Sequence, residues 1–143
     1  MMTPKIETLA RRAFDWEDWR WMPGIAIVDS YGVRGYVVDS APLPDPGAWV
    51  ANRAGVAWLS AEEMGRCLPD LSDHATKGCV LALVREAWET QRGSDCIAST
   101  FHTGTGWGVG SRCASGALAV IVLPTYKTEA EALVAALKAV DAA

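Results

Sequence analysis

The sequence predicts an α+β fold, in which an antiparallel or mixed sheet of about five strands packs against two long helices plus a C-terminal helix. Two observations lead to this class. Helix patterns open the chain, recur in its middle and close it, and short β-branched or apolar runs typical of strands separate them. Because 143 residues, half of them hydrophobic, suffice for one core, we expect a single domain over residues 1–143.

The first helix is predicted over residues 4–15. Thr3 can cap its free N–H groups, and Pro4 suits the first helical position because proline loses no hydrogen bond there. Apolar residues then recur at helical spacing at Ile6, Leu9, Ala10 and Ala13. The helix must end before Pro23, since a proline disfavours helical geometry in the residue that precedes it.

A β-hairpin is predicted next, with strands at residues 25–28 and 35–38 and a loop that contains Gly32. Prolines at every second position of residues 41–47 exclude a central strand there and favour an extended loop. Residues 48–59 carry Trp49, Val56 and Trp58 without clean periodicity. This segment is either a second, looser hairpin or a lid.

The second half of the chain gives clearer signals. Ser60 and Glu63 fit a capping box for a short helical turn, and Ser72-Asp73 opens the longest helix, over residues 74–90. Strands are expected at residues 96–102, 106–110 and 117–123, the last a continuous apolar run suited to a central position. A second capping box at Thr128 begins a final amphipathic helix that reaches residue 140.

Glycines occupy one face of the strand at residues 106–110. Gly104, Gly106, Gly108 and Gly110 share one parity, so that face is bare backbone, which a helix, a ligand or a second chain can approach closely. Simple packing beneath another element, or an exposed hairpin, explains the pattern equally well. No nucleotide-binding glycine motif is present.

The charge balance argues against nucleic acid as a partner. The net charge is −4 and the isoelectric point about 5.1, whereas nucleic-acid binding depends on lysines and arginines that neutralise phosphates. A local positive pocket remains possible if dispersed arginines converge in the fold. They are Arg11, Arg12, Arg20, Arg34, Arg85 and Arg112.

Motifs for catalysis, metals and cofactors are lacking in the sequence, and we expect a protein that is not an enzyme, with no catalytic residue, metal or cofactor. The four cysteines contain no C-x-x-C pair, so we interpret them as small apolar residues in a reducing compartment. Neither His74 nor His102 lies in a metal motif. The N-terminus lacks a signal-like apolar core and no apolar run is long enough to span a membrane, which predicts a cytoplasmic protein without a membrane partner.

Three tryptophans within residues 16–21 form the most unusual stretch of the chain. Arg20 lies between Trp19 and Trp21, and a guanidinium beside indole rings can stack on them while it binds a carboxylate or phosphate. The alternative is an aromatic plug that closes the core. Indoles to stack on a base and cations to bind phosphates give the candidate ligand-binding residues Trp19, Arg20, Trp21, Arg85, Trp88, His102, Trp107 and Arg112.

Residues 19–24 (Trp-Arg-Trp-Met-Pro-Gly), 68–88 and 128–133 resemble segments of small tailed-phage and prophage proteins described as phage α/β/α sandwich domains. The chain departs from the family at His74 and Lys77-Gly78. The resemblance implies a phage accessory protein in the host cytoplasm that counters host immunity. It would be a homo-oligomeric sponge that sequesters a small anionic nucleotide-like signal, or else an inhibitor that binds a host defence protein. An enzyme that degrades the signal is the third alternative.

Overall fold

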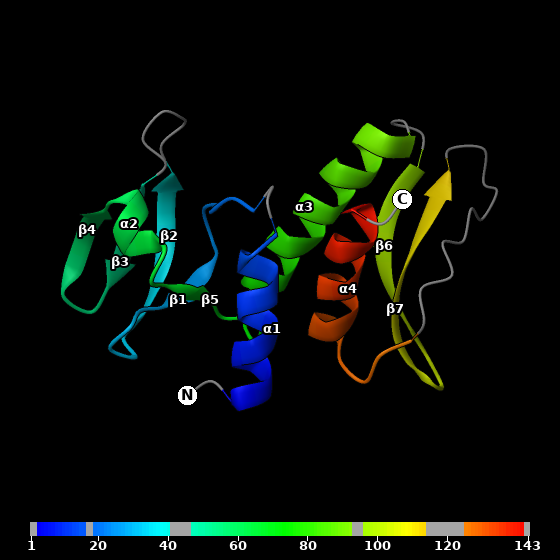
Figure 1. The fold of residues 1–143 in the computed structure, drawn as a ribbon, viewed down its shortest axis with the longest axis horizontal. Coiled ribbons are helices and arrows are strands. Elements are labelled where there is room, and N and C mark those ends of the chain that lie inside the picture. The colour runs from blue at the N-terminus through cyan, green and yellow to red at the C-terminus, as the bar shows by residue number, and fades with distance from the viewer. Residues whose placement is uncertain (1–2, 17–18, 41–46, 93–95, 114–124, 142–143) are drawn as a thin grey trace. The chain divides into compact units, whose positions relative to one another are not determined.

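The computed structural model describes residues 3–16, 19–40, 47–92, 96–113 and 125–141. They form an α+β fold, as predicted, with a five-stranded antiparallel sheet, a two-stranded sheet and helices (Figure 1). By their contacts they group into two compact units, Met1–Cys79 and Val80–Ala143. Each unit has its own sheet, and the organisation as a single domain stays a prediction.

The sheet of the first unit is a meander of four strands to which a fifth strand is added. The strands are β1 (Ala26–Val28), β2 (Arg34–Ser40), β3 (Ala48–Asn52), β4 (Gly55–Leu59) and β5 (Leu68–Pro69). Their order is β4-β3-β2-β1-β5, so only the β1–β5 pairing joins strands that are distant in sequence.

The meander contains two hairpins, one formed by β1 and β2 and the other by β3 and β4. The β1–β2 hairpin confirms the predicted one, and the β3–β4 ladder shows that residues 48–59 form a hairpin and not a lid. The sequence does not reveal β5, because a strand of two residues that ends in Pro69 has no periodicity. The loop predicted at residues 41–47 lies outside the described residues except for Gly47.

Both helices of the first unit begin at the predicted caps. In α1 (Pro4–Phe14) the Thr3 hydroxyl accepts a hydrogen bond from the Ile6 N–H at 3.3 Å. In α2 (Ala61–Met64) the Ser60 hydroxyl accepts from the Glu63 N–H at 3.2 Å, and the Glu63 carboxylate accepts from the Ser60 N–H at 3.3 Å. These reciprocal bonds satisfy donors that the short helix would otherwise leave unpaired.

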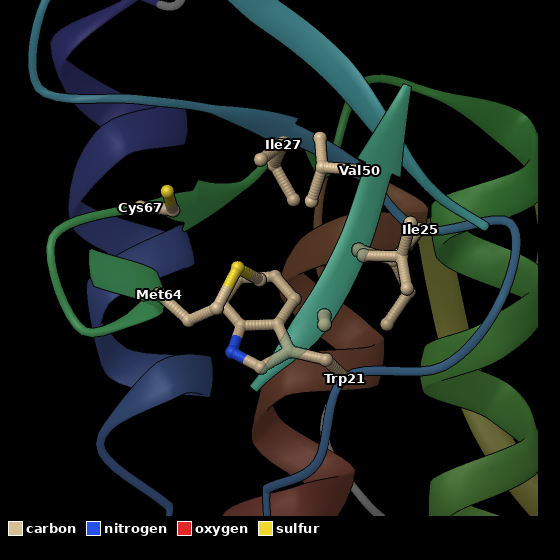
Figure 2. Close-up of a cluster of buried hydrophobic side chains, with 8 residues drawn as sticks. Trp21, Ile25, Ile27, Val50, Met64 and Cys67 are labelled. Carbon is tan, nitrogen blue, oxygen red and sulfur yellow. The ribbon is translucent and has the colours of Figure 1, made fainter. Parts of the chain in front are cut away.

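The inner face of the sheet packs on Trp21, whose indole lies beside the Met64 side chain (Figure 2). Trp21 is only 9% exposed. Its ring also contacts Phe14 at the end of α1 and Trp19, with centroids 5.7 and 5.6 Å away. The buried cluster consists of Trp21, Ile25, Ile27, Val37, Ala48, Val50, Met64 and Cys67.

The outer face of the same sheet carries apolar side chains that reach solvent, and a helix adjoins the sheet at β1. There the Ala26 N–H donates to the buried Thr76 hydroxyl at 2.8 Å, which holds the first turns of α3 (His74–Arg92) against the strand. Large apolar side chains on β2, β3 and β4 stay in contact with solvent. This outer apolar face consists of Tyr36, Val38, Trp49, Val56 and Trp58, of which Val56 is 60% exposed.

Helix α3 starts at the predicted residue, and Asp73 caps it. The Asp73 carboxylate accepts hydrogen bonds from the Thr76 N–H at 3.0 Å and the Thr76 hydroxyl at 3.1 Å. The first unit ends within this helix, at Cys79, and the second begins at Val80. The first turn of the helix, which contains His74 and Lys77, is formed.

The second unit combines a hairpin with a helix. Its elements are β6 (Cys96–Thr103), β7 (Gly106–Cys113) and α4 (Glu129–Asp141). The two strands pair in the predicted place, α4 contacts both, and the Glu131 N–H donates to the Thr128 hydroxyl at 3.2 Å as the second cap. The strand predicted at residues 117–123 lies outside the described residues.

The glycine face of β7 is approached by other parts of the same unit. Phe101, the ladder partner of Gly108, lies over this glycine, and a Cβ there would be 2.5 Å from the ring Cζ. A Cβ on Gly106 would clash with the Tyr126 carbonyl oxygen. Packing within the chain thus accounts for the bare face, which was one of the readings that the sequence left open.

Candidate functional site

A cleft of about 650 Å³ in the first unit is lined by charged side chains. It lies between α1, the β1–β2 loop, the start of β2 and the segment around β5. We call it the arginine cleft, because three arginines from different elements line it. Its charged lining residues are Glu7, Arg11, Asp29, Arg34, Arg66 and Asp70.

Asp70 is the most buried of these groups, at 2% exposed. One carboxylate oxygen accepts from the Arg34 guanidinium at 2.5 Å, and the other accepts from the Ser72 N–H at 3.0 Å and the Ser72 hydroxyl at 2.5 Å. The Asp70 N–H donates to the Ala26 carbonyl at 2.8 Å, which fixes the residue beside β1. Both oxygens thus accept hydrogen bonds from within the chain, and one of them orients Arg34 at the cleft wall.

The β1–β2 loop, a second wall of the cleft, is shaped by Asp29. Its Oδ1 accepts from the N–H groups of Tyr31 at 2.9 Å and Val33 at 2.8 Å, an arrangement typical of aspartate in tight turns. Gly32 takes a φ of 81°, which side chains rarely tolerate. The loop therefore holds a fixed shape, with Ser30 and Gly32 lining the cleft and Tyr31 90% exposed beside it.

Arg11 and Arg66 supply the remaining cationic groups. Arg11 lies in the last turn of α1, one turn after Glu7. Arg66 pairs with Glu62 at 3.0 Å, but both side chains are more than half exposed, and such a pair exchanges readily for another anion. A guanidinium offers a planar fork of donors that matches carboxylate and phosphate groups, so these two arginines can bind an anionic ligand.

Cys67 lies behind the cleft, next to Leu68 of its lining, and is 1% exposed. Burial raises the pKa of its thiol from 9.0 to about 11, and the negative charges of Asp29 and Glu63 add to this effect. The thiol donates to the Glu63 carbonyl at 3.5 Å. A protonated, buried thiol is a poor nucleophile, so Cys67 contributes packing here and not covalent chemistry.

None of the described residues of the tryptophan stretch, Trp16 and residues 19–21, lines the arginine cleft. Trp21 is a core residue, Trp19 is half-buried against it, and Arg20 is exposed. The indole N–H groups of Trp16 and Trp19 are buried and have no acceptor among the described residues. The contacts of Trp21 favour the aromatic plug, while a ligand role for Arg20 stays a prediction.

The remaining predicted site residues belong to the second unit. Arg85 donates from Nε to the Ala98 carbonyl at 2.7 Å, and Trp88 is buried at 3% exposed. His102 and Trp107 are ladder partners on β6 and β7 whose rings meet edge to face at 5.0 Å. Arg112 is the ladder partner of Ile97, and its side chain is outside what the structure describes. Among the described side chains of the predicted site, the ring contacts are therefore His102 with Trp107 and, in the first unit, Trp19 with Trp21.

The sequence left open whether dispersed arginines converge, and two of the six that it named, Arg11 and Arg34, line the same cleft. The sequence did not single out Arg66 or Asp70. The usable signal was Asp70 followed two residues later by Ser72, a common hydrogen-bonding turn, although nothing in that pattern shows which arginine the carboxylate meets.

Within the described ranges, no group of three or more His, Cys, Asp or Glu side chains is arranged to hold a metal ion. None of the helices in the part of the chain that the structure describes is both long and apolar enough to cross a membrane. Comparison with known proteins adds no relative: the chain matches no family model, no curated protein and no solved structure.

Proposed function

We propose that the protein binds a small anionic, nucleotide-like ligand in the arginine cleft and sequesters it without transforming it. The observation that carries this proposal is the placement of Arg11, Arg34 and Arg66, from three separate parts of the chain, around one cavity of about 650 Å³. A volume of this order suits a small-molecule ligand.

The charges of the lining residues restrict how the ligand is held. The cleft carries three arginines and three carboxylates, so its formal charge is balanced and no broad positive field attracts anions. However, Asp70 binds Arg34 and Ser72, and Asp29 binds its own loop. The exposed guanidinium groups of Arg11 and Arg66 are then the ones that contact the ligand, through direct charge-assisted hydrogen bonds.

The resemblance to small phage proteins supplies the context of the proposal. A phage accessory protein that removes a nucleotide-derived immune signal in the host cytoplasm needs tight binding and no chemistry. Asp70 is consistent with this role, because both of its carboxylate oxygens already accept hydrogen bonds, from Arg34 and from Ser72.

The test is thermal melting of the full chain with cyclic dinucleotides, ADP-ribose derivatives and inorganic phosphate. We expect at least one nucleotide to raise the melting temperature of the wild type. Arg11→Gln and Arg66→Gln should each weaken binding by about tenfold or more, since each removes a charge-assisted contact. Arg12→Gln is the matched control, because Arg12 neighbours Arg11 on α1 but does not line the cleft.

Three outcomes would revise the proposal. If no compound in the panel shifts the melting temperature, the protein is not a nucleotide sponge. If Arg20→Ala abolishes binding and Arg11→Gln does not, the ligand lies at the tryptophan stretch. Mass spectrometry of ligand released by denaturation should recover it intact, and recovery of an altered molecule would identify an enzyme.

A further inference from the structure

We propose that the outer edge of β4 is a dimerisation surface, through which a second copy of this chain extends the five-stranded sheet. β4 is the end strand in the order β4-β3-β2-β1-β5, and no described strand pairs with its outer side. Its sequence, Gly-Val-Ala-Trp-Leu, has neither a charged residue nor a proline. Charged residues and prolines normally protect an exposed edge strand from pairing with another chain.

The β3–β4 ladder determines which backbone groups of β4 face outward. Asn52 and Gly55 pair directly across a two-residue turn, so they form a hydrogen-bonded pair, and the alternation of an antiparallel ladder then directs the polar groups of Ala57 toward Val50. The N–H and C=O groups of Val56 and Trp58 point instead to the outer edge. Two donors and two acceptors are therefore available there for a second strand.

Antiparallel pairing of two β4 strands about a two-fold axis at Ala57 satisfies all of these groups. In that register Val56 of one copy lies opposite Trp58 of the other, and both belong to the outer apolar face. Trp58 already contacts Trp49, with ring centroids 5.6 Å apart. The apolar row on β3 and β4 thus continues across the axis into the second copy, which covers part of the exposed Val56 side chain.

The charges at the two ends of β4 fit the same register and favour a second copy over another partner. Arg53, in the turn before β4, is exposed. Glu62, in the helix after it, pairs with Arg66 of its own chain, but its side chain is 81% exposed and can also contact a second cation. Two-fold pairing at Ala57 brings the Arg53 end of one strand to the Glu62 end of the other, and symmetry repeats the contact. Opposite charges therefore meet at both ends of the paired edge.

The experiment measures the mass of the full chain in solution by sedimentation over a wide concentration range. The wild type should be a dimer that dissociates on dilution. Val56→Lys should raise the dissociation constant by about tenfold or more, because it places like charges at the paired edge. Tyr36→Lys is the matched control. Tyr36 is 50% exposed, compared with 60% for Val56, and lies on the same face but on β2, away from the edge, so this variant should leave the dimer intact.

A second set of variants tests the contacts between charged residues. Arg53→Glu should weaken the dimer, and combination with Glu62→Arg should restore it, which a variant that merely misfolds cannot do. A wild type that stays monomeric at every concentration overturns the proposal. So does a dimer that Tyr36→Lys breaks and Val56→Lys does not, since this result would place the contact on the sheet face.

Discussion

Asp70 and Arg34 form an asymmetric ion pair: the Asp70 side chain is 3% exposed, whereas the Arg34 side chain that binds it is 54% exposed. The carboxylate has lost its water and depends on its partners, while the guanidinium keeps contact with solvent. The pair thus joins β5 to the start of β2 from the buried side, and its two halves should respond differently to mutation.

Replacement of the buried half should be costly. Asp70→Ala removes the acceptors of Arg34 and of Ser72, and we expect the free energy of unfolding to fall by about 2–3 kcal/mol, measured by urea denaturation. Glu62→Gln, which breaks the largely exposed pair with Arg66, should change this free energy by less than about 0.5 kcal/mol. Equal effects of the two variants would contradict the structural role of Asp70.

The contact between the sheet and α3 gives a second prediction. Thr76→Val keeps the shape of a side chain that is 0% exposed but leaves the Ala26 N–H without its acceptor. The loss should be about 1–3 kcal/mol in the same assay. Thr76→Ser retains the hydroxyl and should lose clearly less, so a serine variant as unstable as the valine variant would show that the methyl group matters instead.

Trp21 should behave as a core residue. Trp21→Ala leaves a cavity among the buried cluster and should lower the free energy of unfolding by about 3–5 kcal/mol. Trp49→Ala is the contrasting control, because Trp49 is 45% exposed, and the loss there should be markedly smaller. A Trp21→Ala protein of normal stability that fails to bind ligand would instead support a direct role of this indole.

Cys67 makes stability depend on alkaline pH. The unfolded thiol ionises near its ordinary pKa of 9.0, while the folded thiol holds its proton until its raised pKa of about 11. Rising pH therefore stabilises the unfolded state before it affects the folded one. Stability should therefore fall as pH rises from about 9 to about 11, by up to about 1.4 kcal/mol per pH unit. Denaturation of Cys67→Ala at the same pH values should show a shallower fall, and an unchanged slope would exclude the thiol as its cause.

Local signals in the sequence predicted most of the elements, because helix caps and periodic apolar runs depend only on residues that are close in sequence. Thr3, Ser60 and Thr128 each begin a helix as predicted. The features that the sequence did not predict depend on contacts between residues that are distant in sequence. β5 is recognisable only by its pairing with β1, and the arginine cleft contains the contact of Arg34 with Asp70, 36 residues away.

For the tryptophan stretch, the sequence could not distinguish a ligand-binding site from core packing. The residue types of Trp19, Arg20 and Trp21 suit ligand stacking and core packing equally well, so composition alone could not decide between them. The structure places Trp21 among buried side chains, because the sheet packs against this side of the segment. Periodicity cannot supply that information in a segment that is neither helix nor strand.

The strand order of the first unit also has a kinetic consequence. Strands β1 to β4 pair with one another in sequence order, so the meander can assemble through local loop closures, whereas the pairing of β5 with β1 must close the chain between Val28 and Leu68. We therefore expect β5 to join last. Substitutions at its Asp70 anchor should mainly accelerate unfolding, and substitutions within the meander should mainly slow folding.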